Sequence, residues 1–215
     1  LGAALKAAGQ DSAVLSDGAS LAWLFNIRGT DLEFCPFALG YALLHKDGTA
    51  GLFMAPEKIT PELRAHLGPQ VFIAAPEALP GAIATLEGRV VRYDPASQPA
   101  WFEAALKEAR AVIAPGPDPV ALPRAQKNAA EQAGARAAHL RDGVAMVEFL
   151  TWAAEALPRG KETEMSAASR LLACRAAQDK FRGESFPAIS GAGENGAIIH
   201  YRVDEASNLS LIHIS

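Results

Sequence analysis

The chain has 215 residues, of which 50% are apolar, and its 20 basic and 24 acidic residues give a net charge of −4 at pH 7. This apolar content is ample for a buried core and is typical of a globular protein. Neither charge sign is gathered into a block that would suit a phosphate backbone or an anionic membrane surface. We therefore expect neither a nucleic acid nor a membrane as a partner.

The first residue of the chain and its cysteines bear on whether it is a fragment and on the compartment in which it lies. It begins at Leu1 rather than at methionine, so we expect it to be a piece of a longer protein. Cys35 and Cys174 are isolated and lack ligand spacing, which favours a reducing, cytoplasmic compartment over a disulfide framework. No apolar run approaches the roughly 20 residues that cross a bilayer, and no signal-peptide pattern opens the chain.

The first half of the chain alternates between two kinds of segment. Short apolar runs typical of strands occupy residues 13–15, 39–45, 51–55, 71–75, 89–93 and 111–114. Helix-like pieces occupy residues 60–67, 76–86 and 99–109. This alternation predicts an α/β domain.

A proline-rich segment follows this region. Pro115, Pro117, Pro119 and Pro123 fall close together, and each removes a backbone donor and biases its predecessor away from helix. We interpret the segment as an interdomain linker.

Two helices are predicted after the linker. The first covers residues 127–157, and its apolar positions share one side that should face a sheet: Ala133, Ala137, Leu140, Val144 and Val147. The second runs from Thr163, which can cap it, to about Gln178, and Glu164 favours the positive end of its dipole. We expect the helices to lead into a pair of strands within residues 181–201, joined by a glycine-rich turn.

The turn contains GAGENG at residues 191–196, which matches the G-x-G-x-x-G dinucleotide pattern. That pattern works only when the glycines open a helix, whereas the β-branched and aromatic residues after Gly196 prefer a strand. Asn195-Gly196 is also a favoured hairpin turn. We therefore interpret the glycines as turn residues and keep a nucleotide-binding oxidoreductase as the least favoured hypothesis.

His200 follows two isoleucines on the second predicted strand. By itself such a histidine is more often a core residue with satisfied nitrogens than a functional one. His45, His66 and His139 have no second ligand at metal-binding spacing, so we interpret them as ordinary surface or packing residues.

Three segments resemble the aminopeptidase P (Xaa-Pro aminopeptidase) family of pita-bread metallopeptidases in its long three-domain form. AWLFNIRGTD at 22–31 resembles the family's second domain, and KNAAEQAGARAAHLRDGVAMVEFLTW at 127–152 resembles the first helix of its catalytic domain. SFPAISGAGENGAIIHY at 185–201 resembles the strands that lead to its active site and is the most specific of the three. The resemblance implies a creatinase-N-terminal-like α/β domain over 1–125, followed over 126–208 by the first helices and strands of a truncated pita-bread α+β domain.

The resemblance also implies an activity, the release of the N-terminal residue from peptides with proline in second position. Two divalent metal ions, commonly manganese, would activate a hydroxide for attack on the scissile carbonyl. His200 matches the family's substrate-side catalytic histidine, which hydrogen-bonds the peptide and binds no metal. The family's metal ligands, two aspartates, one histidine and two glutamates, lie beyond this segment. We therefore expect the fragment to bind no catalytic metal and to be inactive alone. Its expected partners are an Xaa-Pro peptide and, because the family often dimerises, a second copy.

For several other polar residues and for the two cysteines, the sequence does not favour a catalytic role. Asn26, Arg28 and Asp31 form a polar trio that we interpret mainly as structural, either as a tie within a loop or as the lining of a domain or subunit contact. Ser190 lacks the G-x-S-x-G elbow of a serine nucleophile, and neither cysteine has an assigned histidine.

Residues 209–215, LSLIHIS, look like a translated sequencing adapter, and in that case His213 has no function. A short native strand is the alternative.

For the whole chain, the main alternative to a peptidase fragment is a non-catalytic pita-bread module that binds peptide or protein. A half-built catalytic sheet would expose an unpaired edge, so we predict poor solubility or self-association of the fragment.

Overall fold

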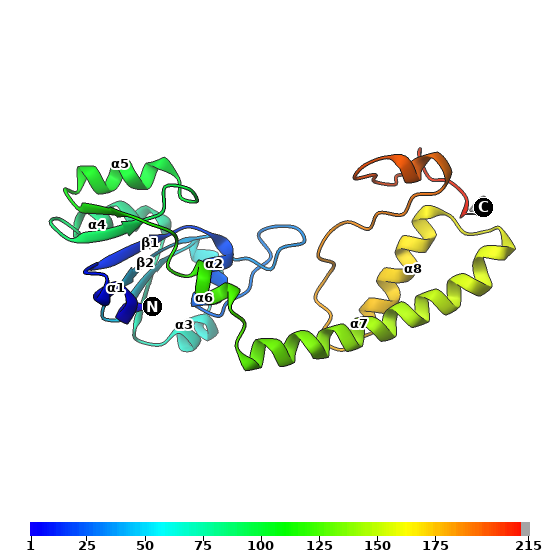
Figure 1. Ribbon diagram of the computed structural model, residues 1–215, viewed down its shortest axis with the longest axis horizontal. Coiled ribbons are helices and arrows are strands. Elements are labelled where there is room, and N and C mark those ends of the chain that lie inside the picture. Colours follow the sequence, from blue (N-terminus) through cyan, green and yellow to red (C-terminus); the bar gives the residue numbers. More distant parts are fainter. Residues whose placement is uncertain (212–215) are drawn as a thin grey trace. The chain divides into compact units, whose positions relative to one another are not determined.

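The computed structural model describes residues 1–211, and its contacts divide the chain into one unit over Leu1–Lys127 and a second unit from Asn128 onward (Figure 1). The interpretation of His213 therefore lies outside the described part of the chain.

The first unit is built on a six-stranded sheet with the order β4-β3-β2-β1-β5-β6. Its strands pair antiparallel from β1 through β2 to β3 and parallel at the other three junctions. Every predicted apolar run forms a strand: β1 Ser12–Leu15, β2 Tyr41–His45, β3 Ala50–Phe53, β4 Val71–Ala74, β5 Val90–Tyr93 and β6 Val112–Pro115. The predicted α/β class of this region is confirmed.

Helices cover both faces of the sheet, because successive strand residues point to opposite sides and each side needs apolar cover (Figure 1). The elements are α1 Gly2–Ala7, α2 Gly18–Leu24, η1 Pro56–Lys58, α3 Pro61–Leu67, η2 Pro76–Ala78, α4 Leu79–Ala84, α5 Ala100–Glu108 and α6 Ala121–Ala125. One core joins the sheet to α1 and α2 through Leu5, Leu15, Leu21 and Leu44. The other joins it to α4 and α5 through Val14, Leu43, Ile83, Phe102 and Leu106.

The proline-rich segment is not a linker, and that prediction was wrong. Pro115 is the last residue of β6, and Val120 is fully buried in the first core. Asp118 is also buried, and it accepts hydrogen bonds from the Ser20 hydroxyl at 2.6 Å and from the Val120 amide at 2.7 Å. Fixed proline φ angles suit a rigid docked turn as well as an extended connection, so the prolines alone did not decide between them.

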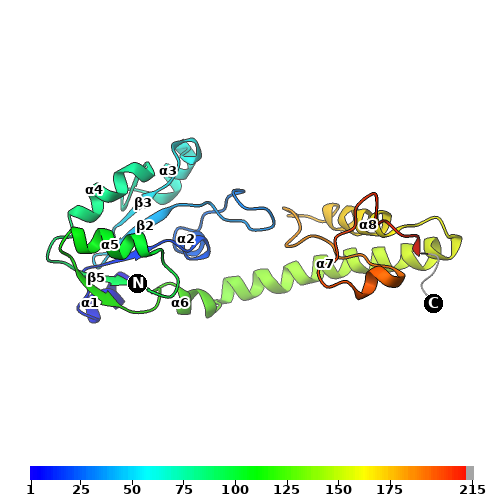
Figure 2. The ribbon, with the colours of Figure 1, turned by 90° about the horizontal axis from the view of Figure 1, so that it is seen from above.

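The second unit is a helical hairpin followed by a long irregular segment (Figure 2). Its elements are α7 Ala129–Ala156, η3 Leu157–Arg159, α8 Glu164–Ala176 and η4 Gly193–Ala197. Asn128 and Glu131 form a capping box at the start of α7. Thr163 caps α8 as predicted, accepting the Ser166 amide at 3.2 Å.

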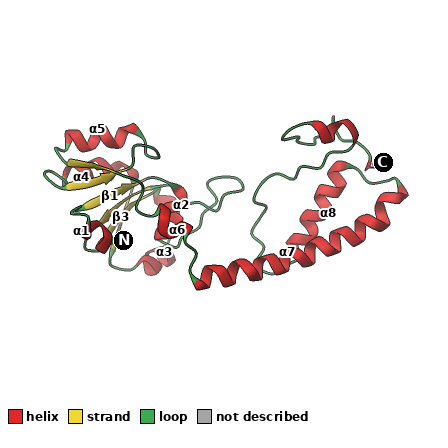
Figure 3. Ribbon diagram, in the orientation of Figure 1, coloured by secondary structure: helices red, strands yellow, loops and turns green. Residues whose placement is uncertain are grey.

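The apolar side of α7 does not face a sheet. Leu140, Val144 and Val147 are 76%, 49% and 63% exposed. Within residues 128–211 the structure forms no strand that could cover them, and Figure 3 shows only helices and loops in this part of the chain. The pattern therefore predicted the helix correctly and its neighbour wrongly.

The predicted strand pair within residues 181–201 was also wrong. Residues 193–197 form the short 3₁₀-helix η4, and Ile198 and Ile199 are 52% and 87% exposed instead of lying in a sheet. The physical reason is a tertiary contact: the Asn195 side chain turns into the unit and contacts Glu164, 31 positions earlier, which favours a compact turn over an extended segment. The pairing that the described part of this unit does show is one isolated bridge, between Thr163 and Ser210.

Candidate functional site

His200 lies on an exposed turn, three residues after the end of η4 at Ala197, and not on a strand. Its backbone has a φ of 55°, in the left-handed region that histidine adopts more readily than most side chains but still at a cost. The Tyr201 amide donates to the Ile198 carbonyl at 3.3 Å and closes the turn. The predicted site residue is therefore open to a partner from outside the unit.

Glu164, the first residue of α8, is the buried centre of the region that carries His200. Its side chain is 0% exposed, and its carboxylate accepts hydrogen bonds from four residues. These donors are the Ala192 amide at 2.5 Å, the Asn195 side-chain amide at 3.2 Å to each oxygen, the Tyr201 hydroxyl at 2.9 Å and the Leu209 amide at 3.0 Å. A buried charge with this many donors can remain ionised.

The protonation states of this cluster agree with its hydrogen bonds. Burial works to raise the pKa of Glu164, but the amides of Leu209 and Ala192, the Tyr201 hydroxyl and the Asn195 amide outweigh it, so the pKa is lowered. Burial, together with the nearby Glu164 carboxylate, raises the pKa of Tyr201. At neutral pH the carboxylate is charged and the phenol keeps its proton, as the contact between them requires.

The sequence predicted only that Glu164 favours the positive end of the helix dipole. Its role as a buried hydrogen-bond acceptor was not predicted. The capping residues Thr163 and Ser166 indicate where α8 begins. They do not indicate that the intervening glutamate is buried, because its donors lie 28 to 45 positions further along the chain. No local signal could have found them.

In the polar trio of the first unit, Arg28 and Asp31 tie a loop together, which is one of the two structural roles expected of them. The Arg28 guanidinium donates to the Ala22 carbonyl at 3.0 Å and to the Ile27 carbonyl at 2.8 Å. Asp31 accepts the Lys58 ammonium at 2.5 Å and the Leu39 amide at 2.6 Å. Asn26 has a φ of 49° in the turn that precedes them.

The other histidines make ordinary local contacts. The Nδ1 atom of His45 lies 2.7 Å from the Ser12 hydroxyl, and burial lowers the pKa of His45 although Asp47 opposes this. The ring of His66 contacts the Phe25 carbonyl at 3.0 Å, and that of His139 contacts the Ala135 carbonyl at 2.8 Å. Gly191, Gly193 and Gly196 flank or form η4 and open no α-helix that could hold a pyrophosphate.

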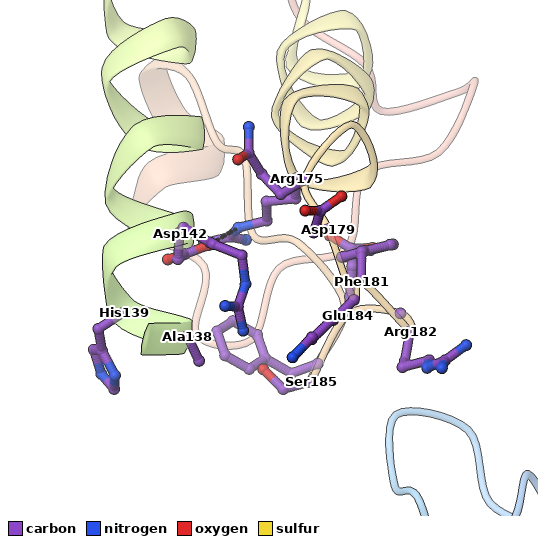
Figure 4. Close-up of a pocket in the computed structure, with 14 residues that line it drawn as sticks. Ala138, His139, Asp142, Arg175, Asp179, Phe181, Arg182, Glu184 and Ser185 are labelled. Atoms are coloured by element: carbon purple, nitrogen blue, oxygen red, sulfur yellow. Dashed lines mark hydrogen bonds and ion pairs between the residues drawn. The ribbon is translucent and has the colours of Figure 1, made fainter. Parts of the chain in front are cut away.

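A cavity of about 390 Å³ lies between α7, the end of α8 and the segment that follows (Figure 4). Arg175 and Asp142 join the two helices across it, with Nε to Oδ1 at 2.8 Å. Charges of both signs line the cavity, and His200 does not belong to its lining. Among residues 1–211, no three histidine, cysteine, aspartate or glutamate side chains are grouped so that they could hold a metal ion.

Comparison with known proteins places both units in families. Residues 1–131 match the creatinase/prolidase N-terminal domain, and residues 133–213 match metallopeptidase family M24. A probable Xaa-Pro aminopeptidase P of Aspergillus clavatus is 36% identical over 87% of the chain, and one of Aspergillus niger is 34% identical over 94%. The chain spans 30% and 34% of these two relatives.

A solved structure is similar over almost the whole chain. The X-prolyl aminopeptidase of Caenorhabditis elegans, described as a cytosolic enzyme with a di-nuclear active site, aligns with a TM-score of 0.86 and 29% identity. The alignment covers 97% of this chain and 35% of that protein.

The helices within residues 1–211 fall short of a membrane span in length or in hydropathy. None of them is both long enough and apolar enough to cross a bilayer.

Proposed function

The chain belongs to the creatinase/prolidase N-terminal domain family and continues into metallopeptidase family M24, and from this premise we propose that it is part of a metal-dependent aminopeptidase. The whole protein would release the N-terminal residue from peptides that carry proline in second position. The observation that carries this proposal is the similarity to the C. elegans X-prolyl aminopeptidase over 97% of the chain. The names of the two Aspergillus relatives support the same substrate class.

His200 is proposed to act on the substrate side of the active site, as a hydrogen-bonding partner of the peptide near the scissile bond. Its exposed turn supports this role, because a side chain held away from a core can reach a bound peptide. Hydrogen bonds that strengthen as charge develops on the peptide are an efficient means of catalysis. We propose no metal-binding role for it.

Two divalent metal ions, with manganese the proposed identity, would supply an activated hydroxide in the whole protein. The described residues offer no ligand set, so the ions do not fit this part of the chain and we derive no step through them. The ligands would come from the rest of the protein, and the isolated chain is proposed to be inactive.

The remaining assignments follow from the same premise. We propose a creatinase-N-terminal-like domain over 1–125, the beginning of the pita-bread domain over 126–208 and an adapter-derived end over 209–215. A cytoplasmic location and a homodimer are proposed as well. The cytosolic description of the C. elegans relative supports the location.

The test begins with the reading frame past Asn208, in which two aspartates, one histidine and two glutamates are expected. The restored protein should release the first residue from an X-Pro peptide but not from a matched X-Ala peptide, lose activity with a chelator and regain it with manganese. Binding of both peptides without cleavage would favour the non-catalytic module instead.

A histidine pair tests the site within the restored protein. His200→Ala should lower kcat by about 100-fold, the effect of removing a donor to a developing charge. His139→Ala is the matched control, because that exposed ring contacts a carbonyl of its own helix. Equal activity of the two variants would contradict the role of His200.

A further inference from the structure

Both ends of the segment that carries His200 are attached to one buried carboxylate. Asn195 begins the segment and Tyr201 ends it, directly after His200. Their side chains both reach Glu164, at 3.2 Å and 2.9 Å. We propose that Glu164 is a positioning residue, which fixes His200 for catalysis without touching substrate. This inference rests on the proposed function.

The attachment is rigid because the two side chains also contact each other. The Asn195 amide donates to the Tyr201 hydroxyl oxygen at 2.9 Å, and both groups lie near the Ser207 carbonyl, at 2.9 Å and 3.1 Å. Asn195 is 8% exposed and Tyr201 6% exposed. A shift of either residue would therefore leave buried polar groups unsatisfied, which is costly.

The backbone between the two anchors is short and closed on itself. The Ile198 amide donates to the Asn195 carbonyl at 3.2 Å, and the Tyr201 amide donates to the Ile198 carbonyl at 3.3 Å. These contacts place His200 one residue away from an anchored side chain. Little freedom remains for its Cα position while Glu164 holds the anchors.

The conformation of His200 itself needs support. A non-glycine residue at a φ of 55° is strained, and such strain persists only where the surroundings hold it. Of the two neighbours of His200, Ile199 cannot supply this support from a core, because it is 87% exposed, whereas Tyr201 is only 6% exposed. The turn is supported by the buried contacts that Asn195 and Tyr201 make to Glu164 and to the Ser207 carbonyl.

The charge of Glu164 is required for this role, since an ionised acceptor forms stronger hydrogen bonds than a neutral one. Glu164→Gln keeps the shape of the side chain but turns an amide group toward donors from Asn195, Tyr201 or the backbone. The substitution should loosen both anchors at once.

The experiment uses the full-length protein with Glu164→Gln, His200→Ala and the double variant. Glu162→Gln is the matched control, because its carboxylate accepts the Ser166 hydroxyl at 2.6 Å, whereas the Glu164 carboxylate accepts Asn195 and Tyr201. Glu164→Gln should lower kcat on an X-Pro peptide by about 10- to 100-fold through misplacement of His200, with a smaller change in KM. The double variant should be no slower than His200→Ala. If the factors by which the two single substitutions lower kcat multiply in the double variant, the proposal is overturned, since Glu164 would then act independently of His200.

Amide hydrogen exchange provides a readout that does not depend on activity. Residues 198–201 should exchange about tenfold faster in Glu164→Gln than in Glu162→Gln, because local opening is easier. If the wild-type protein cleaves no X-Pro peptide but this difference appears, the proposed function fails while the anchoring by Glu164 stands. If Glu164→Gln does not fold, Tyr201→Phe, which removes one hydroxyl, replaces it in both measurements. Unchanged exchange and unchanged kcat in the variant that folds would overturn the positioning role.

Discussion

Tyr201 donates its hydroxyl to Glu164 at 2.9 Å, across 37 positions of the chain. This contact connects the neighbour of the proposed catalytic histidine to the first turn of α8. Its strength depends on the ionisation of Glu164, which gives the region a dependence on pH.

The stability of the region around Glu164 should fall in acid. The pKa of Glu164 in the folded protein is lowered from its ordinary value of 4.5, because hydrogen bonds outweigh burial. Its contribution is therefore fully present above that ordinary value and is lost as the pH falls through the folded pKa. Hydrogen exchange of residues 192–209 between pH 7 and pH 3 should show this loss, and Glu164→Gln should flatten it. An equally steep profile in the variant would contradict the prediction.

The proline-rich segment should behave as part of the first unit. Asp118→Ala removes the acceptor for Ser20 and Val120 and should destabilise the docked segment by about 2 kcal/mol. Limited trypsin digestion should then cut faster after Arg124. The exposed Glu77→Ala is the control, and it should leave the cutting rate unchanged. Rapid cutting already in the wild-type protein would mean that the segment is a linker after all.

Two glycine-to-alanine substitutions should have opposite effects. At Gly134, inside α7, an added Cβ meets nothing within 4 Å, so alanine should stabilise the helix by about 0.5–1 kcal/mol. At Gly29 the same atom would lie 2.7 Å from the Ala38 Cα atom, so backbone must move at a cost of about 1–3 kcal/mol. Thermal unfolding of the two variants measures the difference, and the same sign for both would be the contradicting result.

The isolated chain of residues 1–215 should self-associate. The exposed side chains of Leu140, Val144 and Val147 form an apolar stripe on α7, which favours contact between molecules. Replacing all three by lysine should reduce association in sedimentation velocity, because charges replace that surface. Lysine at the already exposed Ala138 is the control. A wild-type chain that stays monomeric at high concentration would refute the prediction.

Local patterns predicted most elements of the fold. Runs such as residues 41–45 and 90–93 are apolar enough to specify strands by themselves, and Thr163 specifies the start of α8. Local patterns did not predict the order of the strands in the sheet. For example, β1 pairs with β5, which brings Ser12 beside Val91. Alternation of apolar runs indicates that a sheet exists but does not rank its strands.

The candidate site was predicted less completely. The residue type and position of His200 were recognised from a resemblance, and its role remains a prediction. Its turn and its support were missed, because they depend on Asn195 turning inward to a carboxylate 31 positions earlier. Isoleucine-rich sequence favours a strand only when a neighbouring strand is there to pair with it.

The buried Glu164 carboxylate also constrains the order in which the chain can fold during synthesis. The ribosome makes α8 before any of the three donors that precede residue 209, which are Ala192, Asn195 and Tyr201. Until these donors emerge, burying the charge would cost several kcal/mol, so water must continue to solvate it. The beginning of α8 should therefore reach its final environment only after residue 201 has left the exit tunnel.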